Sequence, residues 1–284
     1  MSLNFKLLST SLLLTSLAAC NGGDDDGFTS TPYGCNEPAT ATATATVTIG
    51  ECAISAGYTD FATITSLSNS DCSGYVINDD DGLELMTALE TLNLDSSDLT
   101  YINLAKNIEL INLDLSANEL SCLDLSANTA LTKIYAAENH LESINLSGLT
   151  KLTELYAEEN QLKSIDLSGL TALETVYTYE NYLESINLSG LTALDQLVAF
   201  DNKLTSINLS TNTALTDLQL NGNDFSVTDI TDVADITALL NTSLSRFGIS
   251  YDNLSADIIT ALDDLAQSKG ISICYEENVD NCPD

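Results

Sequence analysis

A period of 21 residues runs through the middle of this 284-residue chain. Leucines recur at that spacing over 89–215, asparagines over 118–223, and isoleucine or leucine over 102–207. Six full repeats fit between residues 89 and 214, and a seventh begins at Leu215. A coil of this length cannot bury its own apolar side chains, so neighbouring coils must stack into a continuous core. The period therefore predicts an elongated solenoid.

Each repeat is built from two similar halves. The segments LTELYAEENQ (152–161) and LKSIDLSGLTA (162–172) both approximate the pattern LxxLxLxx[NL]. Alternation of this kind sends successive side chains to opposite faces, which is typical of a short β-strand. Two halves per coil therefore predict two parallel sheets, one on each side of a flattened solenoid. The asparagine of the first half lies at the bend, where its amide can satisfy the backbone groups of a buried turn.

The pattern resembles the 21-residue nested class of bacterial leucine-rich repeats, called IRREKO, which is related to internalin-like repeats. The resemblance covers about half of the chain. It implies a leucine-rich-repeat solenoid that is β-rich, with short parallel strands on two faces, a helical N-terminal cap and α/β C-terminal coils. It is specific for architecture and much less specific for function, for which it implies adhesion or receptor recognition.

The ends of such a solenoid need caps, because they would otherwise expose leucines. We assign 51–88 to an N-terminal cap, 89–225 to the leucine-rich repeats, and 226–284 to a C-terminal α/β repeat and cap. The segment 50–75, GECAISAGYTDFATITSLSNSDCSGY, resembles the cysteine-containing cap found before such bacterial repeats, with a helix near its start. Residues 254–270 predict a second helix, between apparent strands at 246–250 and 271–273.

The first residues carry the features of an export signal. Residues 1–19 contain one lysine, an apolar run too short to span a membrane, and small residues before Cys20. The residues LAAC at 17–20 resemble the lipobox of bacterial lipoproteins, which implies cleavage before Cys20 and lipidation of that cysteine. A plain cleaved signal is the alternative. Residues 20–50 would then be a lipidated flexible tether, and we expect the protein in the bacterial cell envelope, anchored in the outer membrane and facing the periplasm or the outside.

Export would place the cysteines in a compartment where disulfides can form. Apart from Cys20 the chain has six, an even number that favours three disulfides in an oxidising compartment. We pair Cys274 with Cys282, which are close in sequence, then Cys52 with Cys72 and Cys35 with Cys122, and these last two pairings stay open. We expect no metal site, because no CxxC pair occurs and the NDDDG segment at 78–82 lacks the spacing of a calcium-binding EF-hand.

The chain is strongly acidic, with 42 Asp and Glu against 8 Lys and Arg and a net charge of −34. This charge argues against nucleic-acid binding, which needs clustered basic residues. It argues equally against electrostatic docking on anionic lipid, so membrane contact is expected only through the lipid anchor. No nucleophile and acid accompany His140, and no phosphate-binding loop occurs. The sequence predicts a protein that is not an enzyme and uses no cofactor.

The two halves of the repeat differ in what they project outward. The second-half strand presents a nearly uniform series of Asn and Asp over 103–208, each followed two residues later by a small residue, usually Ser. The first-half strand and its bend present an aromatic patch on neighbouring coils. We define this aromatic patch as Tyr135, Tyr156, Tyr177, Tyr179, Tyr182, Val198 and Phe200.

Two interpretations of the aromatic patch are open. Aromatic residues stack well across strands and could simply stabilise a parallel ladder. They are also enriched at interfaces, and exposed apolar patches usually have a purpose. We favour a recognition surface for a protein partner, rimmed by Lys133, Glu154, Glu158 and Glu159. Glycan binding by the tyrosines is the alternative, and a rigid acidic spacer is a third possibility.

Overall fold

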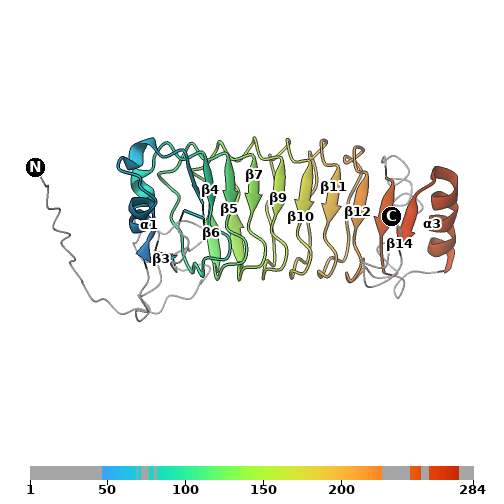
Figure 1. The fold of residues 1–284 in the computed structure, drawn as a ribbon. Helices are drawn as coiled ribbons and strands as arrows, with labels where there is room; N and C mark the ends of the chain where they lie inside the picture. The colour runs from blue at the N-terminus through green and yellow to red at the C-terminus, as the bar shows by residue number, and fades with distance from the viewer. Residues whose placement is uncertain are drawn as a thin grey trace, which may run out of the picture.

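The structure is a computed structural model that describes residues 47–68, 70–71, 77–79, 82–225, 244–250 and 256–274. The described chain forms the expected leucine-rich-repeat solenoid, with its strands side by side along the long axis (Figure 1). Helix α1 (Ile49–Ser55) lies near one end and helix α3 (Ala256–Lys269) near the other. The predicted signal peptide, the lipidation site Cys20 and most of the predicted tether lie outside the described residues.

Ten short parallel strands form one continuous sheet. They are β2 (Ser66–Ser68), β4 (Thr91–Asn93), β5 (Asn112–Asp114), β7 (Lys133–Tyr135), β9 (Glu154–Tyr156), β10 (Thr175–Tyr177), β11 (Gln196–Val198), β12 (Asp217–Gln219), β13 (Arg246–Gly248) and β14 (Ser272–Cys274). They pair in the order β14-β13-β12-β11-β10-β9-β7-β5-β4-β2. The sheet is therefore made of the first-half strand of each repeat, continued into both ends of the solenoid.

The register of this sheet follows the period of the sequence. Leu155 of β9 pairs with Ile134 of β7 on one side and with Val176 of β10 on the other. All three side chains are fully buried, whereas the residues that flank them in each strand are half-buried. The leucine columns of the sequence thus form the core, which runs without interruption from Ile49 to Ile271.

The second face of the solenoid differs from the prediction of one strand per coil. Within the described residues, only β6 (Cys122–Asp124) and β8 (Ser143–Asn145) pair there. Later coils keep the alternation of buried and exposed residues, as over 165–167, but form no ladder. There Asp166 accepts a hydrogen bond from the backbone N–H of Ser168 in its own coil at 2.9 Å. The paired coils make the same local bond at Asp124 and Asn145, so these polar residues close a turn in each coil whether or not its strand is paired.

The asparagine column joins each coil to the one before it. Asn160 is buried, and its Oδ1 accepts a hydrogen bond from the backbone N–H of Leu141 at 2.9 Å. Its Nδ2 donates to the carbonyls of Ala136, Ala157 and Glu158 at 2.9, 3.2 and 3.0 Å. The same pattern is repeated at Asn118, Asn139, Asn181, Asn202 and Asn223. The predicted role of these amides in satisfying a buried turn is confirmed.

The N-terminal cap begins slightly earlier than the sequence predicts. Helix α1 starts at Ile49, and Thr48 caps it: Thr48 Oγ1 accepts from the N–H of Glu51 at 3.1 Å, and the Glu51 carboxylate accepts from the N–H of Thr48 at 3.2 Å. Strand β1 (Val47–Thr48) pairs in parallel with β3 (Ile77–Asp79). Two 3-10 helices, η1 (Phe61–Thr63) and η2 (Leu83–Leu85), complete the described cap.

The C-terminal end of the solenoid contains the predicted helix. Helix α3 lies between β13 and β14 in the chain and is followed by Gly270, whose φ of +70° is in the left-handed region that ends many helices. Strand β14 then extends the sheet, with Ile273 in register beside Phe247. The last described coil is therefore partly helical, as the sequence predicts.

Candidate binding face

The candidate site is the outer face of the ten-stranded sheet. In each strand the central residue points into the core and its two neighbours point outward, so equal positions of successive coils form columns. The register pairs Tyr135 with Tyr156, and Tyr156 with Tyr177. Three tyrosines therefore project side by side from β7, β9 and β10.

The rings of the aromatic patch pack on one another. Tyr135 and Tyr156 are stacked, with ring centroids 4.7 Å apart and an interplanar angle of 9°. Tyr156 and Tyr177 meet edge to face, at 5.0 Å and 64°. Tyr179 and Phe200 form a second stack, at 4.4 Å and 10°. These are favourable geometries for aromatic pairs, so the patch is an ordered surface that also contributes to the stability of the sheet.

Tyr182 and Val198 differ from the other members of the aromatic patch, which are half-buried. Tyr182 lies past the bend and is 48% exposed, and Lys203 Nζ is 5.0 Å from its ring centroid in a cation–π contact. Val198 follows Tyr177 in the tyrosine column but is only 8% exposed. Val198 therefore offers little contact area of its own, whereas Tyr182 offers much.

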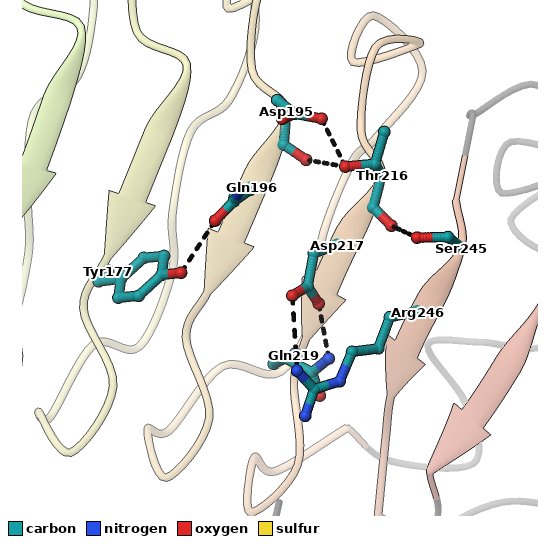
Figure 2. Close-up of polar contacts among 8 residues, drawn as sticks. All are labelled: Tyr177, Asp195, Gln196, Thr216, Asp217, Gln219, Ser245 and Arg246. Carbon is teal, nitrogen blue, oxygen red and sulfur yellow. Dashed lines mark hydrogen bonds and ion pairs between the residues drawn. The ribbon is translucent and has the colours of Figure 1, made fainter. Parts of the chain in front are cut away.

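Polar side chains of the adjacent column hold the tyrosine hydroxyls in place. Glu154 pairs with Lys133 at 2.7 Å and accepts a hydrogen bond from the Tyr135 hydroxyl at 3.3 Å. The Tyr177 hydroxyl donates to Gln196 Oε1 at 2.9 Å (Figure 2). Because these partners fix the hydroxyl groups, the rings form a preorganised surface.

A polar network follows the aromatic patch toward the C-terminal end of the sheet (Figure 2). Asp217 accepts a hydrogen bond from Gln219 Nε2 at 2.6 Å and faces Arg246 Nη1 at 3.9 Å. Gln219 is 2% exposed, and its Oε1 lies so close to Gly248 that any side chain at that position would overlap it. A side chain at Gly248 would therefore force Gln219 and Asn221 to move, and this network lies at the C-terminal end of the aromatic patch.

Glu158 lies within the aromatic patch, whereas the sequence suggests a place at its rim. It is one coil before Tyr179 in the column that continues to Phe200, and the N–H of the next residue, Glu159, donates to the carbonyl of Tyr179 at 3.0 Å. Within the described residues, no donor reaches the buried Oε2 of Glu158. Burial raises the pKa of Glu158 to about 7; a hydrogen bond from its own backbone N–H opposes this shift, and the charges of Glu159 and Glu138 add to it. A carboxyl that titrates near neutral pH in such a surface is a candidate functional group.

A column of acidic residues runs beside the aromatic patch, where the chain leaves the sheet. Its members are Glu138, Glu159, Glu180 and Asp201, each with φ between 50° and 53°. This left-handed backbone costs about 1–2 kcal/mol for a residue with a Cβ. Burial, followed by the charges of Glu180 and Glu138, raises the pKa of Glu159. The sequence does not reveal the backbone conformation of this column, because only Gly222, at the same place in the next coil, is a residue typical of that conformation.

We expect stability to fall as Glu158 ionises. A carboxyl whose pKa is higher in the folded than in the unfolded protein binds its proton more tightly when folded. The pKa of Glu158 is about 7 in the fold, against 4.5 for an ordinary Glu side chain. Its contribution therefore favours folding at low pH and is lost as the pH rises from about 4.5 to about 7. Because the side chain keeps contact with solvent, we expect a loss of only about 1 kcal/mol.

The measurement is urea denaturation across that pH range for wild type, Glu158→Gln and Glu184→Gln. Glu184 is exposed, so its replacement removes one carboxyl without touching the aromatic patch. The Glu158→Gln protein should lack the loss of stability, and the Glu184→Gln protein should follow wild type. Identical pH profiles for the two variants would mean that Glu158 ionises as an ordinary surface carboxyl.

The cysteines of the described chain are consistent with a disulfide framework but do not define its connectivity. Cys52 and Cys274 are buried and Cys122 is half-buried, and none of the three is a free thiol. The predicted partners Cys72, Cys282 and Cys35 lie outside the described residues, so all three pairings stay predictions.

Over the part of the chain that the structure describes, no group of three or more His, Cys, Asp or Glu could hold a metal ion. None of the described helices is long and apolar enough to cross a membrane.

Solved structures of bacterial leucine-rich-repeat proteins resemble this solenoid. The functional domain of InlJ from Listeria monocytogenes, which includes a cysteine ladder, is 29% identical, with a TM-score of 0.59 over 75% of this chain and 49% of that one. The internalin inlF from Listeria monocytogenes str. 4b F2365 is 26% identical, with a TM-score of 0.59 over 72% of this chain and 59% of its own. This chain thus spans between half and three-fifths of the length of those two proteins.

A more distant match supports the fold alone. The leucine-rich-repeat part of FLRT2, in an octameric complex with parts of Latrophilin 3 and Unc5D, is 20% identical, with a TM-score of 0.52 over 71% of this chain and 73% of that one. No protein-family model and no curated protein matches the sequence. The chain is a leucine-rich-repeat solenoid of 21-residue period, and its structural neighbours include internalin-type proteins.

Proposed function

We propose that this protein is a non-enzymatic lipoprotein of the bacterial cell envelope whose solenoid binds a protein partner through the aromatic patch, in adhesion or recognition. The observation that carries the proposal is the run of three tyrosines in ring contact on three consecutive strands of one sheet face. Tyrosines bury a large area at a low cost in side-chain entropy, and they dominate many protein interfaces. The internalin-type neighbours fit a repeat module of this kind.

The packing of the rings favours a protein over a glycan. A sugar stacks on an open ring face, but Tyr135 and Tyr156 use faces on each other, as do Tyr179 and Phe200. Lys203 lies over the ring of Tyr182. One face of each of these rings is therefore already covered, which reduces the open ring surface for a sugar, whereas the hydroxyl groups and remaining ring surface suit the mixed apolar and polar contacts of a protein interface.

The envelope part of the proposal rests on the N-terminal sequence. The lipobox-like LAAC segment at 17–20 would place acyl chains on Cys20, and residues 20–50 would tether the solenoid. An exported chain is also the setting in which three disulfides would form. With a net charge of −34, the solenoid would stay clear of anionic lipid and present the sheet face to solvent.

The experiment is affinity capture of solubilised proteins on the immobilised chain, with a glycan array in parallel. We expect a protein that is retained by wild type and lost from the Tyr156→Ser, Tyr177→Ser double variant. Glycan signals that depend on the tyrosines, with no such protein, would replace this proposal by the glycan alternative.

We expect Cys20→Ser to release the protein from the membrane fraction without unfolding it. The lipid chains would be the only membrane attachment, and residues 20–46 precede the first described element of the fold. The measurement is membrane fractionation followed by thermal unfolding of the released protein. Retention of the variant in membranes after a high-salt wash would contradict the lipoprotein assignment.

A further inference from the structure

We propose that the aromatic patch takes up a basic side chain, an arginine or lysine of the protein partner, and that Glu158 is the carboxylate that pairs with it. This inference rests on the proposed protein binding and names the chemistry of the partner. Its basis is the position of Glu158 among the tyrosines, together with the absence of a donor to Glu158 Oε2 within the described residues.

The carboxyl of Glu158 has a hydrogen bond from its own backbone N–H, but its buried Oε2 has no donor within the described residues. A buried acceptor without a donor destabilises the fold, and more so when it is charged. Lys133, at the rim of the patch, is paired with Glu154 at 2.7 Å. A guanidinium or ammonium group from outside would provide the donor, in a charge-assisted hydrogen bond that is stronger than a neutral one.

The ring beside Glu158 is oriented to receive a cation. Tyr179 and Phe200 are nearly parallel, so one face of Tyr179 is covered by Phe200. The opposite face points along the solenoid axis toward the preceding coil, whose residue in this column is Glu158. A cation near Glu158 would therefore meet a carboxylate and a tyrosine ring together. The chain already uses such a contact at Tyr182, where Lys203 lies over the ring.

The surroundings of the site attract positive charge. The acidic column of Glu138, Glu159, Glu180 and Asp201 runs along the edge of the aromatic patch. These residues keep a left-handed backbone that glycine would adopt without strain, as Gly222 does in the next coil. Their charges would draw a basic segment to the patch, while Glu158 would select the position of one side chain.

Uptake of a cation should be linked to loss of a proton from Glu158. The groups that face this carboxyl are Tyr156, Tyr177 and Tyr179 on the sheet face, with Glu138 and Glu159 at its edge. The side chain is half-buried, so a rotation can bring the carboxylate to the surface. Because only the ionised carboxylate pairs with a cation, affinity should rise as the pH passes through the pKa of about 7.

The test measures the binding of a labelled, arginine-only peptide to the full chain by fluorescence anisotropy. A salt concentration of about 150 mM limits the screening length to about 8 Å and so suppresses diffuse attraction to the net charge. His140 is replaced by glutamine in every protein, so that the one histidine does not contribute to the pH dependence. The variants compared in this background are Glu158→Gln and the matched surface control Glu184→Gln.

We expect the parent and the Glu184→Gln protein to bind about tenfold more tightly at pH about 8 than at pH about 6, because a carboxyl of pKa about 7 goes from about one-tenth to about nine-tenths ionised. The Glu158→Gln protein should bind weakly at both pH values. Urea denaturation at pH about 8 should show it to be at least as stable as the parent.

Two results would overturn the inference: equal affinities for the Glu158→Gln and Glu184→Gln proteins, or a pH dependence that survives in Glu158→Gln. The proposed protein binding has a separate readout, the captured partner and its dependence on Tyr156 and Tyr177. If that partner still needs the tyrosines while the peptide ignores Glu158, only the basic side chain is ruled out. If no captured protein depends on the tyrosines, the proposed function itself fails.

Discussion

Replacing Leu155 with alanine is expected to lower the free energy of unfolding by about 2–5 kcal/mol. Leu155 is fully buried at the centre of β9, between Ile134 and Val176 in the neighbouring strands. Truncation removes buried methyl groups and leaves a cavity that neighbouring coils on both sides cannot readily close. In a solenoid the damage should also spread to adjacent coils, since each coil is stabilised mainly by its neighbours. Urea denaturation measures the loss, and hydrogen exchange in β7 and β10 measures its spread.

The matched control is Ile108→Ala, because Ile108 is an exposed aliphatic residue of the same solenoid. That change should stay within about 0.5 kcal/mol of wild type, as is usual for surface substitutions. A loss below about 1 kcal/mol for Leu155→Ala would mean that the register of the repeat is wrong.

The core and the turns could be predicted from the sequence because both depend on the period. Once the residues of one column are known to share an environment, burial of Leu155 implies burial of Ile134 and Val176. The same holds for the asparagines, since a turn that needs the amide of Asn160 needs it again in each coil. Repetition thus turns one local inference into a long-range one.

The second face could not be predicted, because the alternation of side chains does not determine backbone pairing. Residues 165–167 alternate as a strand does, yet Asp166 bonds the N–H of Ser168 within its own coil. Asn145 was expected to project outward but is 3% exposed, and it donates to Asp124 of the preceding coil at 2.9 Å. Asn145 also accepts from the N–H of Ser147 in its own coil, so the local bond accompanies pairing in one coil and occurs without it in another, and composition does not decide between these outcomes.

In the candidate site, too, the sequence predicts the columns of residues but not the burial or backbone conformation of each residue. The tyrosine column follows from the period, but the period does not show that Glu158 is half-buried or that Val198 is only 8% exposed. The left-handed backbone at Glu138, Glu159 and Glu180 carries no signal in the sequence, since glutamate is not typical of that conformation. These are the positions where the structure adds most to the functional hypothesis.

We expect the Tyr156→Ser, Tyr177→Ser double variant to lose affinity for the captured partner by about 2 kcal/mol or more, roughly 30-fold in Kd. The two rings lie at the centre of the aromatic patch, and their removal would delete its largest contact area. The fold should survive, because both side chains point away from the core. The loss of stability should be modest, about 0.5–1.5 kcal/mol for each aromatic pair that is removed. Calorimetric titration with the partner and thermal unfolding of the variant give the two quantities.

The control for this variant is Lys163→Ser with Glu184→Ser, which changes two exposed residues of adjacent coils away from the sheet face and leaves the net charge unchanged. Its affinity should equal that of wild type. The opposite pattern is equally informative. If the tyrosine variant keeps its affinity but melts at a much lower temperature than the control, the rings of Tyr135, Tyr156 and Tyr177 are a structural ladder, and the partner binds elsewhere on the solenoid.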